Sequence, residues 1–372
     1  MSEPLSALRS PLHDRHVALG ASFAEFGGWE MPVAYPTGVL KEHAAVREAV
    51  ALFDVSHLGK ATVTGPGAVD LLDRTLSNDL GRIGAGQAQY TLCLDAATGG
   101  IVDDLIVYRH ADDRLLLVPN AANTAEVIDR LRAEAPAAVT IADRHRDDAV
   151  IAVQGPFADQ TLRAAGLPSG HDYMHFVETT FGPDGATVVV CRTGYTGERG
   201  YELIVANEAA PGLWDHLLAA GAEFGITPAG LGARDTLRTE MGYPLHGQDI
   251  SLDTTPNEAR LGWAVGWEKP VFWGREAVVA ERAAGPRRLL RGIVAQGRAI
   301  PRPHQQVFLS EHVPIGEVTS GTFSPTLKKG IGMALVSTVV NPEADVTVDV
   351  RGRREVFHLT RPPFLPTHVR EA

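Results

Sequence analysis

Two adjacent aspartates inside an apolar run constrain this chain more than any other feature. Residues 99–108 read Gly-Gly-Ile-Val-Asp-Asp-Leu-Ile-Val-Tyr, and β-branched residues after a Gly-Gly turn predict a buried strand. A buried carboxylate is costly unless another group pairs with it or uses it. Alternation along a strand puts Asp104 on the face of Val102 and Asp103 on the face of Ile101, so we expect no paired acid–base dyad. An aspartate that only caps a strand-end turn is the alternative.

The composition bounds the class of protein. A chain of 372 residues with 44% hydrophobic and 21% charged residues is long enough for two or three globular domains. It has no apolar run near ~18 residues, and its start lacks a basic region followed by an apolar core, so we expect no membrane contact and no secretory signal. Cys93 and Cys191 lie in apolar, strand-like runs and are expected to be small core residues in a reducing, cytoplasmic compartment. Without CxxC or HExxH we expect no metal site.

The charge is acidic overall and uneven along the chain. A net charge of −11 argues against nucleic acid as a partner. Residues 286–372 hold twelve Lys and Arg against seven Asp and Glu, whereas residues 1–285 hold twenty-two against thirty-eight. The basic C-terminal part is either a set of protected strand edges or a docking surface for an acidic partner.

Hydrophobic periodicity divides the chain into three stretches. Strand and helix patterns alternate from about residue 53 to residue 141, which indicates an α+β unit, and a second such stretch begins near residue 149. After Pro286, short strands broken by Gly and Pro predict a small barrel or sandwich, with residues 280–285 as the linker. Thr37 is the expected N-cap of a helix over residues 38–51.

Two further segments carry chemistry. Three glycines lie between two strands within residues 192–202, where we expect the backbone to approach another group closely, although an ordinary hairpin is equally open. Glu202 follows in an apolar strand, and an acceptor there suits a ligand with adjacent N–H donors such as an aminopyrimidine. Downstream, Thr227 is the expected N-cap of a helix that places Arg234 and Arg238 on one face.

Taken together, these segments resemble one family closely. In order they read FGGWEMPVAY, LFDVSHLGK, GGIVDDLIVY, RTGYTGERGYE, GLGARDTLRTEMGYPLHGQDI and SGTFSPTLKKGIGMALV. This pattern resembles the aminomethyltransferases, the T-proteins of the glycine cleavage system, nearly from end to end. The resemblance implies an α+β fold of three domains around a central hole that binds folate. The first domain is split between residues 1–51 and 142–270, residues 52–141 are an inserted α+β domain, and residues 275–372 form a C-terminal β-barrel-like domain.

The resemblance also implies the reaction. T-proteins take an aminomethyl group from the lipoyl arm of H-protein and pass its methylene to tetrahydrofolate. The products are 5,10-methylenetetrahydrofolate, ammonia and dihydrolipoyl H-protein. Tetrahydrofolate is therefore the implied co-substrate, without metal or flavin, and lipoylated H-protein and the other glycine cleavage components are the implied partners.

Particular residues match the family's functional positions. Asp104 stands at the catalytic aspartate. Val369 stands where some relatives have a tyrosine that touches the substrate, so that contact is not expected here. Folate or substrate binding is implied for Leu58, Val118, Asn120, Tyr195, Glu202, Arg234 and Trp263.

Two other functions remain open on sequence grounds. One is a demethylase subunit that acts with a separate flavoprotein. The other is a folate-binding accessory protein of iron–sulfur cluster assembly, although those proteins carry a cysteine in the segment that here reads Arg192–Glu198 without one.

Overall fold

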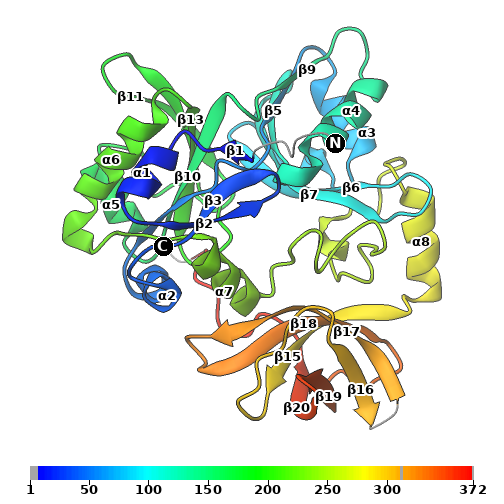
Figure 1. The fold of residues 1–372 in the computed structure, drawn as a ribbon. Coiled ribbons are helices and arrows are strands. Elements are labelled where there is room, and N and C mark those ends of the chain that lie inside the picture. Colours follow the sequence, from blue (N-terminus) through cyan, green and yellow to red (C-terminus); the bar gives the residue numbers. More distant parts are fainter. Residues whose placement is uncertain (1–6, 311–312, 371–372) are drawn as a thin grey trace, which may run out of the picture.

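The computed structural model describes residues 7–310 and 313–370. Within these residues the strands form a three-stranded sheet, a six-stranded sheet, a five-stranded sheet and a closed barrel. Figure 1 shows the six-stranded sheet (green) and the five-stranded sheet (cyan) side by side, with the barrel (orange and red) beneath them. The predicted α+β class and C-terminal barrel are confirmed.

The N-terminal part is a small sheet fastened to the six-stranded sheet. Strand β3 lies between β1 and β2, and the buried ring of His16 joins Tyr35 to Asp54, with Nε2 2.8 Å from the Asp54 carboxylate. Because these polar groups are buried and partnered, they hold this N-terminal part against the six-stranded sheet. The elements are β1 (Leu8–Arg9), α1 (His13–Ala18), β2 (Ser22–Phe26), β3 (Trp29–Ala34) and α2 (Val39–Glu48).

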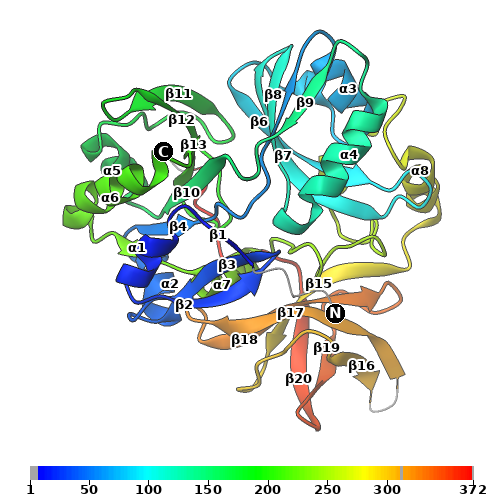
Figure 2. The same ribbon diagram turned by 45° about the horizontal axis from the view of Figure 1, so that its top comes forward.

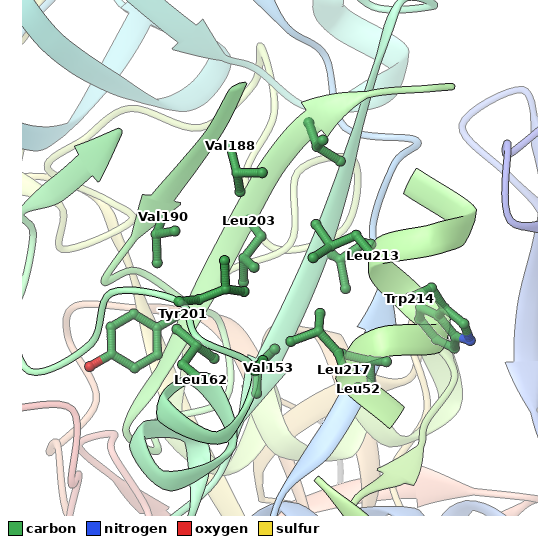
Figure 3. Close-up of a cluster of buried hydrophobic side chains, with 14 of the residues drawn as sticks. Leu52, Val153, Leu162, Val188, Val190, Tyr201, Leu203, Leu213, Trp214 and Leu217 are labelled. Atoms are coloured by element: carbon green, nitrogen blue, oxygen red, sulfur yellow. The ribbon is translucent and has the colours of Figure 1, made fainter. Parts of the chain in front are cut away.

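The six-stranded sheet has the order β11-β12-β13-β10-β4-β14 and is antiparallel except for the β14–β4 pair. Helices α5 and α6 cover one face of it, where Leu162 and Leu217 belong to one buried cluster with Leu203 and Val153 (Figure 3). Such a fully apolar layer supplies most of the stability of this part. The elements are β4 (Ala51–Asp54), β10 (Asp148–Gln154), α5 (Ala158–Ala164), β11 (Phe176–Phe181), β12 (Ala186–Cys191), β13 (Gly200–Ala206), α6 (Ala210–Ala220), η3 (Ala222–Phe224) and β14 (Thr227–Pro228).

The five-stranded sheet has the order β6-β7-β8-β5-β9 and is antiparallel throughout. Helices α3 and α4 cover one face, and the buried Cys93 lies in that core as predicted. The elements are β5 (Ala61–Thr64), α3 (Ala68–Thr75), η1 (Leu80–Arg82), β6 (Gln87–Leu94), β7 (Ile101–Ala111), β8 (Arg114–Val118), η2 (Ala121–Asn123), α4 (Thr124–Glu134) and β9 (Thr140–Asp143).

The other faces of these two sheets meet each other. Tyr108 and Leu116 from the five-stranded sheet share one buried cluster with Phe53, Cys191 and Ile204 from the six-stranded sheet. This shared cluster places the strand that carries Asp104 opposite the strand that carries Glu202. Figure 2 shows the two sheets facing each other across the middle of the molecule.

The C-terminal part is a barrel that closes in the order β15-β18-β17-β16-β19-β20. Closure leaves no free sheet edge, and an apolar cluster that includes Val318 and Phe357 fills the interior. The remaining elements are α7 (Leu231–Met241), η4 (Gly262–Ala264), α8 (Arg275–Ala284), β15 (Arg288–Ala295), β16 (Gln306–Ser310), β17 (Val313–Ser324), β18 (Lys329–Ser337), β19 (Asp345–Val350) and β20 (Arg353–Thr360).

Three local predictions were wrong. Residues 280–284 are the end of α8 rather than a linker. Gly38, not Thr37, is the N-cap residue of α2. Thr227 and Pro228 form β14, which pairs with β4, so that α7 begins only after Gly230. Pairing with a distant strand overrode the local capping signal in the last case.

We propose that the chain divides into the three domains implied by its family resemblance. Strand pairing supports a split first domain, because β4 and β10 are neighbours in one sheet although the whole five-stranded sheet lies between them in sequence. By sheet membership the chain changes from one part to the next after Asp54 and after Asp143.

Helix α7 joins the N-terminal part to the barrel through buried charges. The Glu240 carboxylate contacts Arg47 Nη2 of α2 at 2.7 Å and accepts hydrogen bonds from Ser324 of β17 and from the neighbouring Thr326. Although burial opposes ionisation, these hydrogen bonds and the contact with His43 lower the pKa of Glu240 from 4.5 to about 2. The ionised carboxylate therefore stabilises the folded chain.

We expect Glu240→Gln to be less stable than the wild type by about 3 kcal/mol near neutral pH. A lowered folded-state pKa gives stability that is present above pH 4.5 and is lost as pH falls toward about 2. Denaturant unfolding at several pH values should show the two proteins converging across that window. The exposed Glu223→Gln is the control, and an equal pH dependence in all three proteins would contradict this role.

Candidate active site

A β-bulge in β7 determines which side chains share a face with the two aspartates. Cys93 pairs with Asp103, but the next pair joins Leu94 to Ile101, so Val102 is an extra residue in the strand. Val102 therefore packs in the core under α3 and α4, and Ile101 packs in a different cluster. The expectation that Val102 shares the face of Asp104 was wrong, because simple alternation does not anticipate the bulge.

The two carboxylates meet at one amide despite lying on opposite faces of the strand. Asn120 Nδ2 donates to Asp103 Oδ1 at 2.9 Å and to Asp104 Oδ1 at 2.8 Å, and the backbone N–H of Asn120 donates to Asp103 Oδ2. Asn123 Nδ2 donates to the same Asp103 oxygen at 2.7 Å. Asn120 reaches both because it follows the end of β8, so the predicted independence of the two aspartates does not hold for their hydrogen bonding.

His246 completes this network. Its Nε2 lies 3.0 Å from the carbonyl oxygen of Ile101, which accepts only, so Nε2 carries the hydrogen. Its Nδ1 then accepts from Asn123 Nδ2 at 3.0 Å. His246 thus orients Asn123, which in turn holds Asp103.

Burial shapes the acidity of both aspartates. Loss of water raises the pKa of Asp103 well above its usual range, and the neighbouring Asp104 raises it further. Burial also raises the pKa of Asp104, whereas hydrogen bonds from Tyr90 and Asn120 stabilise its charged form and oppose that rise. Asp104 is the more exposed of the two and is the one suited to exchange a proton with a ligand.

Aromatic rings flank Asp104. The Tyr90 hydroxyl donates to Asp104 Oδ2 at 3.0 Å, and the Tyr90 ring stacks on Trp263 with centroids 5.0 Å apart. Trp263 is 62% exposed, an unusual state for so large an apolar ring. Tyr90 was not predicted from the sequence. Its position on β6, the strand that pairs with β7, could have indicated that it lies near Asp104.

Glu202 lies across the central cluster from Asp104. Thr193 donates to Glu202 Oε2, and no described residue donates to Oε1. The side chain is nevertheless buried, with only 9% of its surface exposed. Glu202 therefore presents one free acceptor at a nearly dry place, as expected for a site that binds N–H donors.

Arg234 lies beside Glu202. Its guanidinium stacks on the Tyr195 ring at 4.7 Å, and it makes no hydrogen bond within residues 7–310 and 313–370. Burial lowers the pKa of Arg234, whereas the charge of Glu202 raises it. Burial and the charge of Arg234 also lower the pKa of His57 to about 3, so His57 is neutral. Arg234 thus has free donors where Glu202 has a free acceptor.

The other residues predicted to bind folate or substrate lie in or at the edge of the same region. Leu58 and Val118 are partly buried against the central cluster, and Tyr195 donates its hydroxyl hydrogen to the Pro244 carbonyl. Trp263 lies at the edge, linked to the site through Tyr90. Arg238 shares the helix with Arg234 but forms a buried ion pair with Asp249 at 2.7 Å, so it is structural.

The glycines of residues 192–202 have a packing role. A Cβ at Gly197 would lie 2.1 Å from Met241 Sδ, and one at Gly194 would lie 2.3 Å from Gln154 Oε1. The expected close approach is therefore made to neighbouring side chains of the protein. This approach brings α7, and with it Arg234, against the loop that carries Tyr195.

Family models match most of the chain. The GCVT N-terminal domain matches residues 12–269, and the glycine cleavage T-protein C-terminal barrel domain matches residues 287–365. A chain built of these two parts belongs to the glycine cleavage T-protein class of transferases.

Comparison with individual proteins is more specific. The chain is 61% identical to an aminomethyltransferase of Frankia alni over 97% of this chain and 99% of that protein. It is 55% identical to one of Mycobacterium tuberculosis over the full length of both. The crystal structure of glycine cleavage system aminomethyltransferase T from Bartonella henselae superposes with a TM-score of 0.91 at 36% identity, covering 98% of this chain and 99% of that one. The chain belongs to the aminomethyltransferases, the T-proteins of the glycine cleavage system, and the predicted transferase activity is confirmed.

The described residues contain neither a membrane-spanning helix nor a cluster of metal-ligating side chains. No helix among residues 7–310 and 313–370 is long and apolar enough to cross a membrane. In the same part of the chain, no three or more His, Cys, Asp and Glu side chains are grouped so as to hold a metal ion.

We expect Tyr90→Phe to raise the pKa of Asp104, because the lost hydroxyl no longer stabilises the carboxylate. Titration of ¹³C-labelled aspartate carboxyl signals by NMR measures this directly. Tyr173→Phe is the control, because the Tyr173 ring contacts Arg370 and the hydroxyl that donates to Asp104 is that of Tyr90. An unchanged or lowered value in Tyr90→Phe would show that the Tyr90 bond does not govern Asp104.

Proposed function

We propose that this chain transfers the methylene of an aminomethyl-lipoyl group to tetrahydrofolate, and that tetrahydrofolate binds between Asp104 and the Glu202–Arg234 pair. The observation that carries this is the free Oε1 of Glu202 beside the free guanidinium of Arg234. A pterin presents adjacent N–H donors together with a carbonyl acceptor, and a free acceptor beside a free donor matches that pattern. The apolar side chains of Leu58 and Val118 suit the flat faces of such a ring.

Asp104 is the proposed catalytic residue. Positive charge develops on the methylene carbon as ammonia leaves, and a carboxylate in a partly dry cleft stabilises that charge. Because burial raises the pKa of Asp104, the carboxylate is also a stronger base for the proton that the attacking folate nitrogen releases. Tyr90 and Asn120 hold both oxygens of Asp104 and so fix its direction. Most of the acceleration then comes from holding the two substrates together.

The proposed partner is lipoylated H-protein, acting with the other glycine cleavage components in the cytoplasm. Family membership supports this partner, because T-proteins work with H-protein. Roles for metal, flavin, nucleic acid or membrane are not part of the proposal.

We expect Asp104→Asn to lower kcat at least about 100-fold, because the amide neither offsets positive charge nor accepts the proton. The assay measures methylenetetrahydrofolate formed from aminomethylated H-protein. Asp113→Asn is the matched control, since Asp113 is exposed at the other end of the β7–β8 hairpin. Asp103 is unsuitable as a control because it is hydrogen-bonded to Asn120 and Asn123. A loss of less than tenfold in a folded Asp104→Asn protein would refute the assignment.

We expect Glu202→Gln to weaken tetrahydrofolate binding by about 1–3 kcal/mol, since an acceptor is replaced partly by a donor. Titration calorimetry measures the dissociation constant. The exposed Glu208→Gln, two residues beyond the end of β13, is the control. Unchanged affinity in Glu202→Gln would make Glu202 a strand residue without a role in the site.

A further inference from the structure

A basic hollow opens beside the candidate active site. It encloses about 330 Å³, and its lining includes Asn257, Arg260, Trp263, Trp267, Arg282 and Arg361. No aspartate or glutamate lines it. Three arginines around two indole rings make a concave surface that favours an anion.

The arginines of this hollow lack protein counter-ions. Within residues 7–310 and 313–370, none of Arg260, Arg282 and Arg361 forms an ion pair with a carboxylate. Arg260 Nη1 is buried and has no hydrogen-bond partner, and the charge of Arg361 adds to burial in lowering the pKa of Arg260. The nearby Glu281 is occupied, because its Oε2 accepts from Thr255 and Asn257. Mutually repelling cations without counter-ions favour a ligand that carries several negative charges.

One side chain, Trp263, links the hollow to the proposed reaction site. Trp263 lines the hollow and stacks on the Tyr90 ring. The Tyr90 hydroxyl in turn donates a hydrogen bond to Asp104. On the other side of the hollow, the Arg282 guanidinium lies 4.0 Å over the Trp267 ring, which leaves its N–H edges free to bind. A ligand that reaches past Asp104 and over Trp263 therefore arrives at arginines.

We propose that this hollow binds the γ-linked glutamate chain of a polyglutamylated tetrahydrofolate. The inference rests on the proposed binding of tetrahydrofolate between Asp104 and Glu202, and it adds a determinant of co-substrate specificity. Each γ-linked glutamate adds one α-carboxylate, and arginine matches carboxylates through paired N–H donors. The ring part of the folate occupies the central cleft, and its tail leaves past Trp263.

The shape of the site favours this tail over an acidic protein surface. A protein surface would meet arginines that project from a convex face, whereas Arg260, Trp263 and Trp267 line a concave space suited to one extended chain. A tail that is covalently part of the bound co-substrate also gains from its high effective concentration at the hollow.

The experiment compares tetrahydrofolate monoglutamate with tetrahydrofolate pentaglutamate. The measured quantity is the ratio of their KM values, with a free aminomethylated dihydrolipoamide as the other substrate so that H-protein docking does not enter. For the wild type we expect the pentaglutamate KM to be lower by about tenfold at low salt. Higher ionic strength should reduce that preference, since salt screens the charges.

The variants test the arginines singly and together. Arg361→Gln and Arg282→Gln, both at exposed residues, should each reduce the preference, and the double variant should bring the ratio close to one. Arg353→Gln, exposed on the barrel strand β20, should keep the wild-type ratio. Thermal unfolding midpoints confirm that each variant is folded.

The outcomes separate this inference from the proposed function. Activity with monoglutamate but an equal KM for pentaglutamate would overturn the tail site and leave the transferase assignment intact. Inactivity of the wild type with both folates would overturn the proposed function itself. If the double variant keeps the pentaglutamate preference and loses activity only when H-protein is the substrate, the hollow binds an acidic partner instead of the tail.

Discussion

The buried charges of α7 are the interactions on which the rest of the structure depends. Arg238 forms an ion pair with Asp249 and donates to Ser320 in the barrel, and Glu240 joins Arg47 of α2 to Ser324 of the barrel. Such groups are strongly destabilising when one partner is removed, because the other is left buried without compensation. The same helix carries Arg234 into the candidate active site one turn earlier. The contacts that hold the parts together therefore also fix the position of a residue proposed to bind the ligand.

The site itself is divided between two sheets that have separate cores. Asp104 belongs to the five-stranded sheet and Glu202 to the six-stranded sheet, and the apolar cluster around Tyr108 and Ile204 holds the two faces together. Each sheet has helices over its outer face, so the candidate site lies on the inner faces. A planar ligand that touches both walls would stabilise their approach, since binding to the folded form alone raises stability.

The sequence supported the fold more fully than the details of the site. Apolar alternation and turns located β7, β8 and β10 to within a few residues, because these strands are local patterns of side-chain burial. The same reasoning singled out Asp104 and Glu202, since a carboxylate in an apolar strand is conspicuous. It missed the bulge at Val102, the strand at Thr227 and the pairing of β4 with β10, which depend on partners remote in sequence. Tyr90 and His246 were missed for the same reason, as each acquires its role only through a neighbour that the fold supplies.

The fixed direction of the hydrogen bonds around Asp104 limits where a proton can go. Asn120 and Asn123 donate their amide hydrogens to the carboxylates, and His246 directs its Nε2 hydrogen to the Ile101 carbonyl. Amide groups do not relay protons, so no proton passes from Asp104 through Asn120 or Asn123. Within the described residues, the Tyr90 hydroxyl is the one remaining side-chain contact of Asp104, and its hydrogen also points toward the carboxylate. In the proposed role of Asp104, a proton that the carboxylate takes up is therefore returned to a substrate or to water rather than passed to these neighbours.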